Sequence, residues 1–411
     1  MREADANPPA GQMGFREFVA LMAALMAVNA LSIDAMLPVL PQIGETLGLA
    51  TRNEQQWVIT AYLLGFGAAQ LAYGPLADHF GRKPVLLTGL ALYTAFSVLA
   101  GFTGSLATMI VARALAGVGA AATRVLTITI IRDFYSGRRM ARVMSLTFIV
   151  FLAAPIVAPS LGQAIALAAP WQWIFGALAV FGASIALWAA RRLPESLHPE
   201  DRRTMTPQSV IRGFRVVLSS RLAVGYTLGL SVMLGALFAF INSVQQVFAD
   251  ALGRPAMMPL IFAFIAGWMA VASFLNSRIV ERIGTRRVSH TALLGFIGVA
   301  TVHGLVAFAG YESVWTFAVL QSAMMFCFGL IGANFNSIAM EPLGHLAGTA
   351  SSVIGFTTTV AGALIGFYVG QQFDGTVVPL TLGFVVCGVT ALGLVAITER
   401  GRLFHPAEAP A

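Results

Sequence analysis

The sequence predicts an all-α integral membrane protein in which twelve transmembrane helices form two pseudo-symmetric bundles of six. Three observations lead to this fold class. Hydrophobic residues make up 57% of the 411-residue chain and charged residues only 10%, whereas a soluble domain carries about 25% charged residues. Apolar stretches of about 20 residues, the length that crosses a bilayer, recur along the whole chain. A short charged hinge also occurs twice, once in each half.

The apolar stretches give the position of each helix. We expect spanning helices at residues 17–42, 53–77, 84–102, 105–131, 140–167, 171–190, 219–247, 256–278, 288–310, 313–340, 346–371 and 378–398. All of the 25 Lys and Arg residues except Arg52, Arg113, Arg124 and Arg254 then fall in segments on one side of the membrane. The positive-inside rule makes that side the cytoplasm, with both termini. A basic face for nucleic acid would lie on soluble elements, which this chain lacks.

A polar segment separates the two halves. We assign residues 1–190 to an N-terminal six-helix bundle, 191–218 to a cytoplasmic linker and 219–411 to a C-terminal six-helix bundle. The mixed charges of the linker indicate a solvated connection, and a regulatory site is the alternative. The first 16 residues are polar and lack a short apolar core with a cleavage site, so we expect no cleaved signal peptide.

The charged hinge of the first half reads Gly-Pro-Leu-Ala-Asp-His-Phe-Gly-Arg-Lys-Pro at residues 74–84. A weaker copy lies 203 positions later, where Asp78 corresponds to Glu281, Gly81 to Gly284 and Lys83 to Arg286. Two matching hinges predict two similar bundles that rock against each other, an architecture of solute carriers.

Further charges at the predicted cytoplasmic helix ends favour a gating role. We expect the gating groups to include the hinge residues Asp78, Arg82 and Lys83 and the helix-end residues Arg132, Asp133 and Glu341. Asp78 is expected to cap the hinge or to pair with Arg132, Arg138 or Arg139.

Ionisable residues inside a membrane are costly and therefore point to function. Asp34 lies six residues before Leu40 and Arg113 lies eight residues after Ser105, so both sit about 9–12 Å below the outer boundary. Equal depth predicts that they pair. Burial favours the neutral form of a carboxyl group and a nearby guanidinium favours its charged form. Proton coupling by Asp34 and Arg113 is our hypothesis, and a static ion pair or direct cation binding are the alternatives.

Arg124 follows Arg113 by eleven residues, about three helical turns, so both point the same way. We expect Arg124 near the inner end of a cavity, where it attracts a substrate or braces the inner gate. Snorkelling of its side chain to the cytoplasmic interface is an equal alternative.

Aromatic, Met and amide residues in the spans predict a substrate pocket. Met and aromatic side chains re-pack easily around varied apolar shapes, and three amides cluster in the seventh helix. Together with Asp34 and Arg124, we expect the pocket to include Tyr62, Phe66, Phe151, Phe238, Asn242, Gln245, Gln246 and Met325. We expect His303 to be packed and hydrogen-bonded, with a proton relay as the alternative.

Nothing in the sequence indicates a cofactor, a metal site or a disulfide framework. The two cysteines, Cys327 and Cys387, lie in apolar segments, and the six His residues are scattered. Gly117-Val118-Gly119 begins a run that is similar to a dinucleotide fingerprint, but it follows no strand and lies inside a helix. Close helix packing is the better interpretation.

These motifs resemble those of the major facilitator superfamily. The hinge at 74–84 looks like its signature loop, and Arg113-Ala114-Leu115-Ala116-Gly117 is similar to its fourth-helix motif, where the Arg is linked to proton transfer. Residues 154–162 resemble the Pro/Gly motif of drug:proton antiporters, which implies gating roles for Pro155, Pro159 and Gly162. Ala154 and Ala158-Pro159 depart from the general form in the manner of the Bcr/CflA branch. Residues 31–38, with Asp34, look like the first helix of that branch. We expect Gly162 to contact the opposite bundle.

The resemblance implies a proton-coupled multidrug efflux transporter of a bacterial inner membrane that exports small amphipathic drugs by alternating access. We expect a monomer that binds drug, protons and lipid, without a cofactor, a metal or nucleic acid. An exporter or importer of a metabolite such as a sugar is the alternative. A membrane-embedded enzyme or sensor is a second rival, which the lack of a catalytic motif disfavours.

Overall fold

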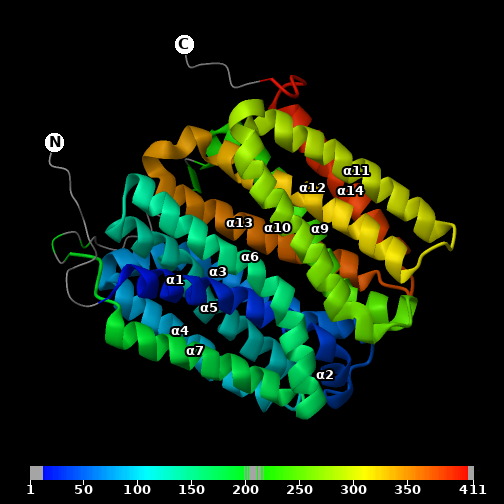
Figure 1. The fold of residues 1–411 in the computed structure, drawn as a ribbon, viewed down its shortest axis with the longest axis horizontal. Coiled ribbons are helices and arrows are strands. Elements are labelled where there is room, and N and C mark those ends of the chain that lie inside the picture. The colour runs from blue at the N-terminus through cyan, green and yellow to red at the C-terminus, as the bar shows by residue number, and fades with distance from the viewer. Residues whose placement is uncertain are drawn as a thin grey trace. The chain divides into compact units, whose positions relative to one another are not determined.

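The computed structural model describes residues 13–198, 200, 202, 211, 214, 215 and 217–405 (Figure 1). Within this part the chain is helical and forms no strand, which confirms the predicted fold class. The long helices are α1 (Phe15–Asp34), α3 (Trp57–Phe80), α4 (Arg82–Gly101), α5 (Leu106–Phe134), α6 (Gly137–Ala168), α7 (Gln172–Arg192), α9 (Arg221–Gln246), α10 (Met258–Ile283), α11 (Thr285–Phe308), α12 (Val314–Met340), α13 (Ala347–Gln371) and α14 (Val378–Thr398).

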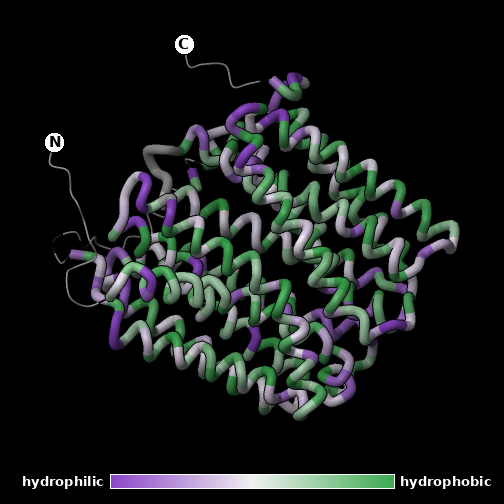
Figure 2. The backbone as a smooth tube through the Cα atoms, viewed as in Figure 1, coloured by the Kyte–Doolittle hydropathy of each residue, from purple (hydrophilic) through white to green (hydrophobic). Residues whose placement is uncertain are grey.

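Eleven helical segments of the described residues are long and apolar enough to cross a membrane, against twelve predicted spans. The remaining long helix is α3. Its 24 residues extend about 36 Å, more than the roughly 30 Å of hydrocarbon in a bilayer. Figure 2 shows hydrophobic residues along most of the helices.

Large apolar side chains on the outside of the helices are numerous. Phe102, Leu167 and Phe308 are each more than 80% exposed. A soluble protein rarely exposes so many large apolar groups, so this surface fits contact with lipid.

The helices form two compact units, one of Met1–Gly48 and Ala61–Val210 and the other of Leu49–Thr60 and Ile211–Ala411. The same helix pairs pack in each unit. In the first, α4 packs on α5 and α7, and α1 packs on α5, α6 and α7; in the second, α11 packs on α12 and α14, and α9 packs on α12, α13 and α14. This correspondence confirms two pseudo-symmetric bundles.

The domain boundaries derived from the sequence, at 190/191 and 218/219, stay a prediction. Much of the proposed linker, namely residues 199, 201, 203–210, 212, 213 and 216, lies outside the described residues. The described segment Leu49–Thr60 is notable because it belongs to the second unit, although it lies between stretches of the first. It contains the short helix η2 (Arg52–Gln56) and the first turn of α3.

The first predicted helix, 17–42, is not continuous. It divides into α1, a 3-10 turn at Leu37–Val39 and α2 (Leu40–Thr46). Pro38 explains the break, because proline lacks an N–H and disfavours helical geometry at the residue before it. The last turn of the predicted helix 219–247 likewise changes to a π-helical turn, Val247–Ala251. The other predicted helices agree with the structure to within a few residues.

Glycines allow the helices of the first unit to approach closely. A Cβ atom on Gly117 would lie 2.1 Å from the carbonyl oxygen of Tyr62, and one on Gly65 would lie 2.0 Å from that of Ala114. A Cβ atom on Gly119 would lie 2.4 Å from the backbone nitrogen of Tyr93. These contacts confirm that the Gly117-Val118-Gly119 run serves helix packing, and they fix α5 against α3 and α4.

Candidate functional site

The end of α1 is bound by a buried arginine of α5. The Arg113 side chain is fully buried and donates a hydrogen bond of 2.8 Å to the carbonyl oxygen of Ser32. Because α1 ends two residues later, at Asp34, this carbonyl is one of the terminal groups without a partner in its own helix. Inside a membrane such a group needs another donor, and the guanidinium provides it.

Ser32 is also bound through its side chain. Its hydroxyl group donates to the carbonyl oxygen of Val28 at 2.6 Å and lies 2.7 Å from the hydroxyl oxygen of Tyr93. The last turn of α1 is therefore held by groups of α4 and α5, directly before Asp34.

Asp34 is buried, with 4% of its surface exposed. The direct contact predicted between Asp34 and Arg113 stays a prediction. Arg113 is joined to the backbone two residues before Asp34. The hydrogen bond to Ser32 places the Arg113 guanidinium beside the end of α1, where Asp34 lies.

The small residues of α1 pack against α6. Ala27 and Ala30 form a buried cluster with Ala154, the residue directly before Pro155. Pro155 and Pro159 lie inside α6, which continues as one helix to Ala168. Small residues of α1 therefore form a packed wall against α6.

Gly162 of α6 makes the closest backbone contact near Asp34. A Cβ atom on Gly162 would lie 1.7 Å from the carbonyl oxygen of Ala35. Ala35 belongs to the same unit as Gly162, and the predicted contact of Gly162 with the opposite bundle stays a prediction. The Pro/Gly motif packs on the residue that follows Asp34.

Two arginines and two aromatic rings form a continuous row in the first unit. The guanidinium carbon of Arg113 lies 4.5 Å from the centre of the Tyr62 ring, which stacks on the Phe66 ring at 6.2 Å. The guanidinium carbon of Arg124 lies 6.0 Å from the centre of the Phe66 ring. Each distance is within the range of cation–π or ring–ring attraction. Four of the predicted pocket and coupling residues thus meet at one place.

The remaining predicted pocket residues do not join this row in the described contacts. Phe151 lies edge-on to Phe148 at 6.2 Å on α6. Phe238 is buried in the second unit, where a Cβ atom on Gly366 would lie 2.6 Å from its Cβ atom. Met325 is also buried there.

The three amides predicted in the seventh helix are engaged in a buried amide network of the second unit. The network joins η2 and the start of α3 to α9 and α13. The amide group of Gln55 donates to Gln245 at 3.2 Å. Asn242 donates to Thr60 at 3.4 Å, and its own carbonyl oxygen has no partner among the described residues.

Gln56 lies at the centre of the amide network. Its nitrogen donates to Gln246 at 2.7 Å and to the carbonyl oxygen of Gly370 at 2.9 Å, and its oxygen accepts from Gln371 at 3.1 Å. Asn53 accepts from Gln246 at 2.6 Å and donates to the carbonyl oxygen of Gln371 at 3.0 Å. Sequence reasoning missed the members from 53–56 and 371.

An ion pair between Arg52 and Asp250 lies beside the network. Both residues line a surface depression together with Asn53, Gln246 and Phe373. The amide network therefore ends at an open surface of the second unit.

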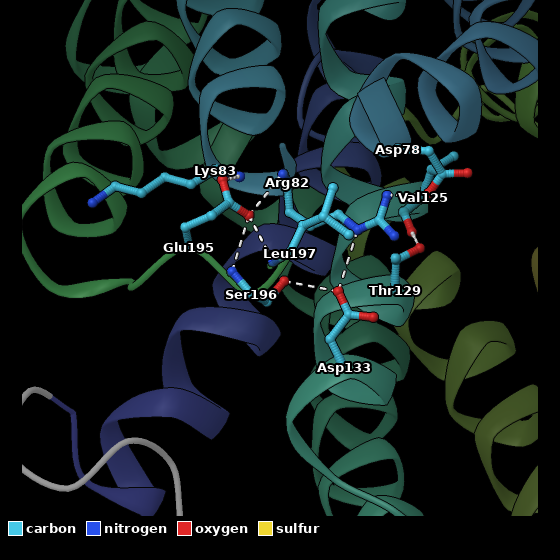
Figure 3. Close-up of polar contacts among 9 residues, drawn as sticks. All are labelled: Asp78, Arg82, Lys83, Val125, Thr129, Asp133, Glu195, Ser196 and Leu197. Carbon is cyan, nitrogen blue, oxygen red and sulfur yellow. Dashed lines mark hydrogen bonds and ion pairs between the residues drawn. The ribbon is translucent and has the colours of Figure 1, made fainter. Parts of the chain in front are cut away.

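Arg82 is the centre of the hinge of the first unit (Figure 3). Its guanidinium group pairs with Asp78, four residues earlier, and with Asp133 at 3.2 Å. The predicted partners of Asp78, Arg132, Arg138 and Arg139, are thus wrong as its ion-pair partners. Asp78 lies in the last turn of α3 and Arg82 is the first residue of α4, so the turn at Gly81 brings them together.

Glu195, which follows α7, completes this hinge. Its carboxylate accepts from the backbone N–H groups of Arg82 at 2.9 Å and Lys83 at 3.2 Å. An anion at the N-terminus of a helix satisfies free N–H groups and interacts well with the helix dipole. The neighbouring Ser196 donates to Asp133 at 2.8 Å. The sequence signal for Glu195 was weak, because it lies 113 residues from Arg82.

The hinge of the second unit repeats this arrangement around Arg286, which pairs with Glu341 at 3.1 Å and with Glu399 at 2.9 Å. Gly81 and Gly284 both have positive φ, +104° and +93°, a conformation that suits glycine. By its contacts Arg286 corresponds to Arg82, whereas the sequence alignment of the hinges matched it with Lys83.

Glu399 also accepts a hydrogen bond of 2.7 Å from the hydroxyl group of Tyr226. That hydroxyl group lies 2.8 Å from Nε2 of His290. The described residues contain no group of three or more metal-ligating side chains.

A model of the Major Facilitator Superfamily matches residues 22–366 of the chain. The chain is 27% identical to a bicyclomycin resistance protein homolog of Haemophilus influenzae, covering 93% of this chain and 96% of that protein. It is 26% identical to Multidrug resistance protein D of Escherichia coli, covering 84% and 86%. The fold is similar to that of the xylose transporter XylE from E. coli, with a TM-score of 0.69 at 12% identity over 91% and 95% of the two chains.

Proposed function

Since the chain belongs to the Major Facilitator Superfamily, a family of membrane transporters, we propose that it exports small amphipathic drugs in exchange for protons. Two of its relatives carry the names bicyclomycin resistance protein homolog and Multidrug resistance protein D. The observation that carries the coupling is a buried acid, Asp34, at a helix end that a buried arginine holds in place.

In the proposed cycle a drug enters from the cytoplasm or the inner leaflet while Asp34 is deprotonated. A proton from outside then binds Asp34. Its neutralisation changes the charge next to the backbone contact of Arg113 and weakens the hold on the drug. Tyr62, Phe66 and Arg124 form the part of the drug site that lies beside Arg113, since they share one row with it.

The gates of the proposed cycle are the two hinges. Arg82 contacts Asp133 at the end of α5 through its side chain, and Glu195 beyond α7 through its backbone N–H. Arg286 contacts Glu341 at the end of α12 and Glu399 beyond α14. Breaking such a buried, multiply bonded arginine contact costs free energy, so these contacts stabilise one state of the carrier. Pro155, Pro159 and Gly162 keep α6 packed on the end of α1, and thereby limit proton leakage through an empty site.

We place the protein in a bacterial inner membrane, as a monomer with both termini in the cytoplasm. The basis is the distribution of Lys and Arg, which favours that side for the loops of both halves. The amides of α9, which the sequence assigned to the drug site, are better explained as structural groups of the second unit, because they bind the segment 55–60.

The experiment is a drug-susceptibility panel on cells that express the wild type or the Asp34→Asn variant. We expect the variant to insert and fold, because the amide has the same shape, and to lose proton-driven export. Full resistance in cells with the variant would refute the role of Asp34. Measuring drug accumulation with and without an uncoupler separates drug export from metabolite export. If the protein exports a metabolite, the uncoupler does not change drug accumulation and the panel shows no resistance in either strain.

A further inference from the structure

A histidine and a glutamate that the proposed cycle does not use meet in the second unit, at the end of α11 away from its hinge. Nε2 of His303 lies 3.2 Å from Oε1 of Glu312. The His303 side chain is fully buried and that of Glu312 is 10% exposed. His303 lies on α11 before its end at Phe308, about 7.5 Å deeper along the helix axis. Ionisable groups at such a depth point to function.

The loop between α11 and α12 brings the two groups together. The chain leaves α11 through Gly310, whose φ of +75° suits glycine. The backbone N–H of Tyr311 donates a hydrogen bond back to the last turn of α11, and Ser313 caps the start of α12. Glu312 lies directly before that cap, so the loop turns its carboxylate toward His303.

In the described helices that pack around His303, the charged residues are confined to the hinge end. α11 packs on α10, α12 and α14, and the sequences of α12 and α14 contain no charged residue. The charged residues of α10 and α11 lie near the hinge at Gly284 and are Arg278, Glu281, Arg282, Arg286 and Arg287. The other titratable side chains of these helices are His290, near the hinge, and the thiols of Cys327 and Cys387.

The charged loop residues at the same end of the helices are exposed or bound elsewhere. Asp250 pairs with Arg52, and Asp374 accepts a hydrogen bond of 2.7 Å from the hydroxyl group of Thr376. Arg254 is exposed. The described partner of the Glu312 carboxylate is therefore the imidazole of His303.

Each member of the pair also has a second buried polar atom. Nδ1 of His303 and Oε2 of Glu312 have no hydrogen-bond partner among the described residues, which is unfavourable for a buried polar atom. When the imidazole is neutral and donates to the carboxylate through Nε2, both of these atoms are acceptors. Each of them can therefore bind a proton.

The net charge of the pair favours one bound proton. With a neutral imidazole and an ionised carboxylate the pair carries one negative charge, and with one further proton it carries none. An uncompensated charge is costly away from water, and the apolar ring of Phe317 lies 5.5 Å from the ring of His303. Two groups in such contact bind protons as a unit. A proton, unlike an organic molecule, needs no cavity.

We propose that His303 and Glu312 form a proton-binding site of the second unit, which holds one proton in an acidic medium and releases it in an alkaline one. Asp34 belongs to the first unit, so this is a second site, and it does not depend on drug export. The orientation proposed above places this end of α11 at the outer face. The pair then takes its proton from the side that supplies protons for the exchange.

The test counts the protons that the purified full-length protein takes up, without drug, in a potentiometric titration from about pH 8 to about pH 5.5, where histidine ordinarily titrates. We expect Glu312→Gln to take up about one proton per molecule less than the wild type, because the pair titrates as a unit and a buried imidazole beside a neutral amide stays uncharged. An isolated glutamate titrates near about pH 4.3, so removal of an ordinary acid changes this count little.

Glu281→Gln is the matched control. It removes the same charge from an exposed glutamate of α10, and we expect its proton uptake to equal that of the wild type. Glu312→Asp keeps an acid and should keep most of the uptake. Thermal unfolding shows whether each variant is folded, and Glu312→Ala, which also removes the acid, replaces Glu312→Gln if that variant does not fold.

Equal proton uptake by the wild type and the folded variant without the acid overturns the proposal. An equal loss in Glu281→Gln also overturns it, because the difference then does not come from the pair. Either result leaves the proposed export function standing if the Asp34→Asn strain loses proton-driven resistance. Persistence of that resistance overturns the export mechanism instead, whatever the titration shows.

Discussion

The contact between Gly162 and Ala35 leads to the most specific prediction of this structure. A Cβ atom at residue 162 would lie 1.7 Å from the Ala35 carbonyl oxygen, and real Cβ atoms essentially never come within 3.0 Å. In a Gly162→Ala variant the two helices therefore have to separate by about 1.3 Å, and overpacking of this kind costs about 1–3 kcal/mol. Because the displaced residue follows Asp34, proton-driven export should fall as well.

A matched control separates this collision from the effect of alanine on helix formation. Replacing glycine by alanine inside a helix stabilises it by about 1 kcal/mol, which offsets part of the collision in α6. Gly176 lies inside α7, and a Cβ atom there would have its nearest neighbour at 3.7 Å, an ordinary contact. Gly176→Ala therefore measures the helix effect alone.

The assay is thermal unfolding of the purified wild type and the two variants, with proton-driven export in vesicles as the second measurement. We expect Gly176→Ala to unfold at or above the wild-type temperature and to transport normally. Gly162→Ala should unfold below Gly176→Ala, by a difference that corresponds to about 1–3 kcal/mol. The reasoning is wrong if Gly162→Ala unfolds at the same temperature as Gly176→Ala and exports as well.

Two further substitutions test the amide network and the hinge. Gln56→Leu leaves buried amide and carbonyl partners unsatisfied, at a cost of about 1–3 kcal/mol each. Its unfolding temperature should therefore lie clearly below that of the control Gln372→Leu, which replaces an exposed side chain. Equal unfolding temperatures would show that the amide network contributes little to stability. Glu195→Gln removes the negative charge from the first turn of α4, so it should lower the free energy of unfolding by about 1 kcal/mol. Glu200→Gln, at an exposed residue, should leave that free energy unchanged. If the Glu195→Gln variant is as stable as the wild type, Glu195 does not stabilise α4 as a cap.

The helices were predictable from the sequence because a bilayer imposes their length and composition. Boundaries at residues such as Arg82, Gly101 and Thr398 follow from where apolar runs meet charge or glycine. The break in the first helix was missed although Pro38 was visible in the sequence. The apolar run continues past it, and hydropathy does not distinguish one helix from two short ones in line.

The partners of the polar residues were harder to predict than their depth. Depth follows from counting residues along a helix, which placed Asp34 and Arg113 at one level. Rotation about the helix axis and the side-chain rotamer decide which groups meet, and the bond from Arg113 to the backbone of Ser32 could not be predicted from depth. The partners of Gln245 and Gln246 come from a segment 190 residues away. No local sequence pattern predicts such a hydrogen bond.

The amide network has a consequence for how acidity acts on this protein. Carboxamide side chains neither gain nor lose protons over the pH range in which cells live. The hydrogen bonds of Gln56, Gln245 and Gln246 therefore keep the same strength in acidic and alkaline surroundings. The response of this protein to acidity is therefore left to its carboxyl groups and other titrating side chains elsewhere.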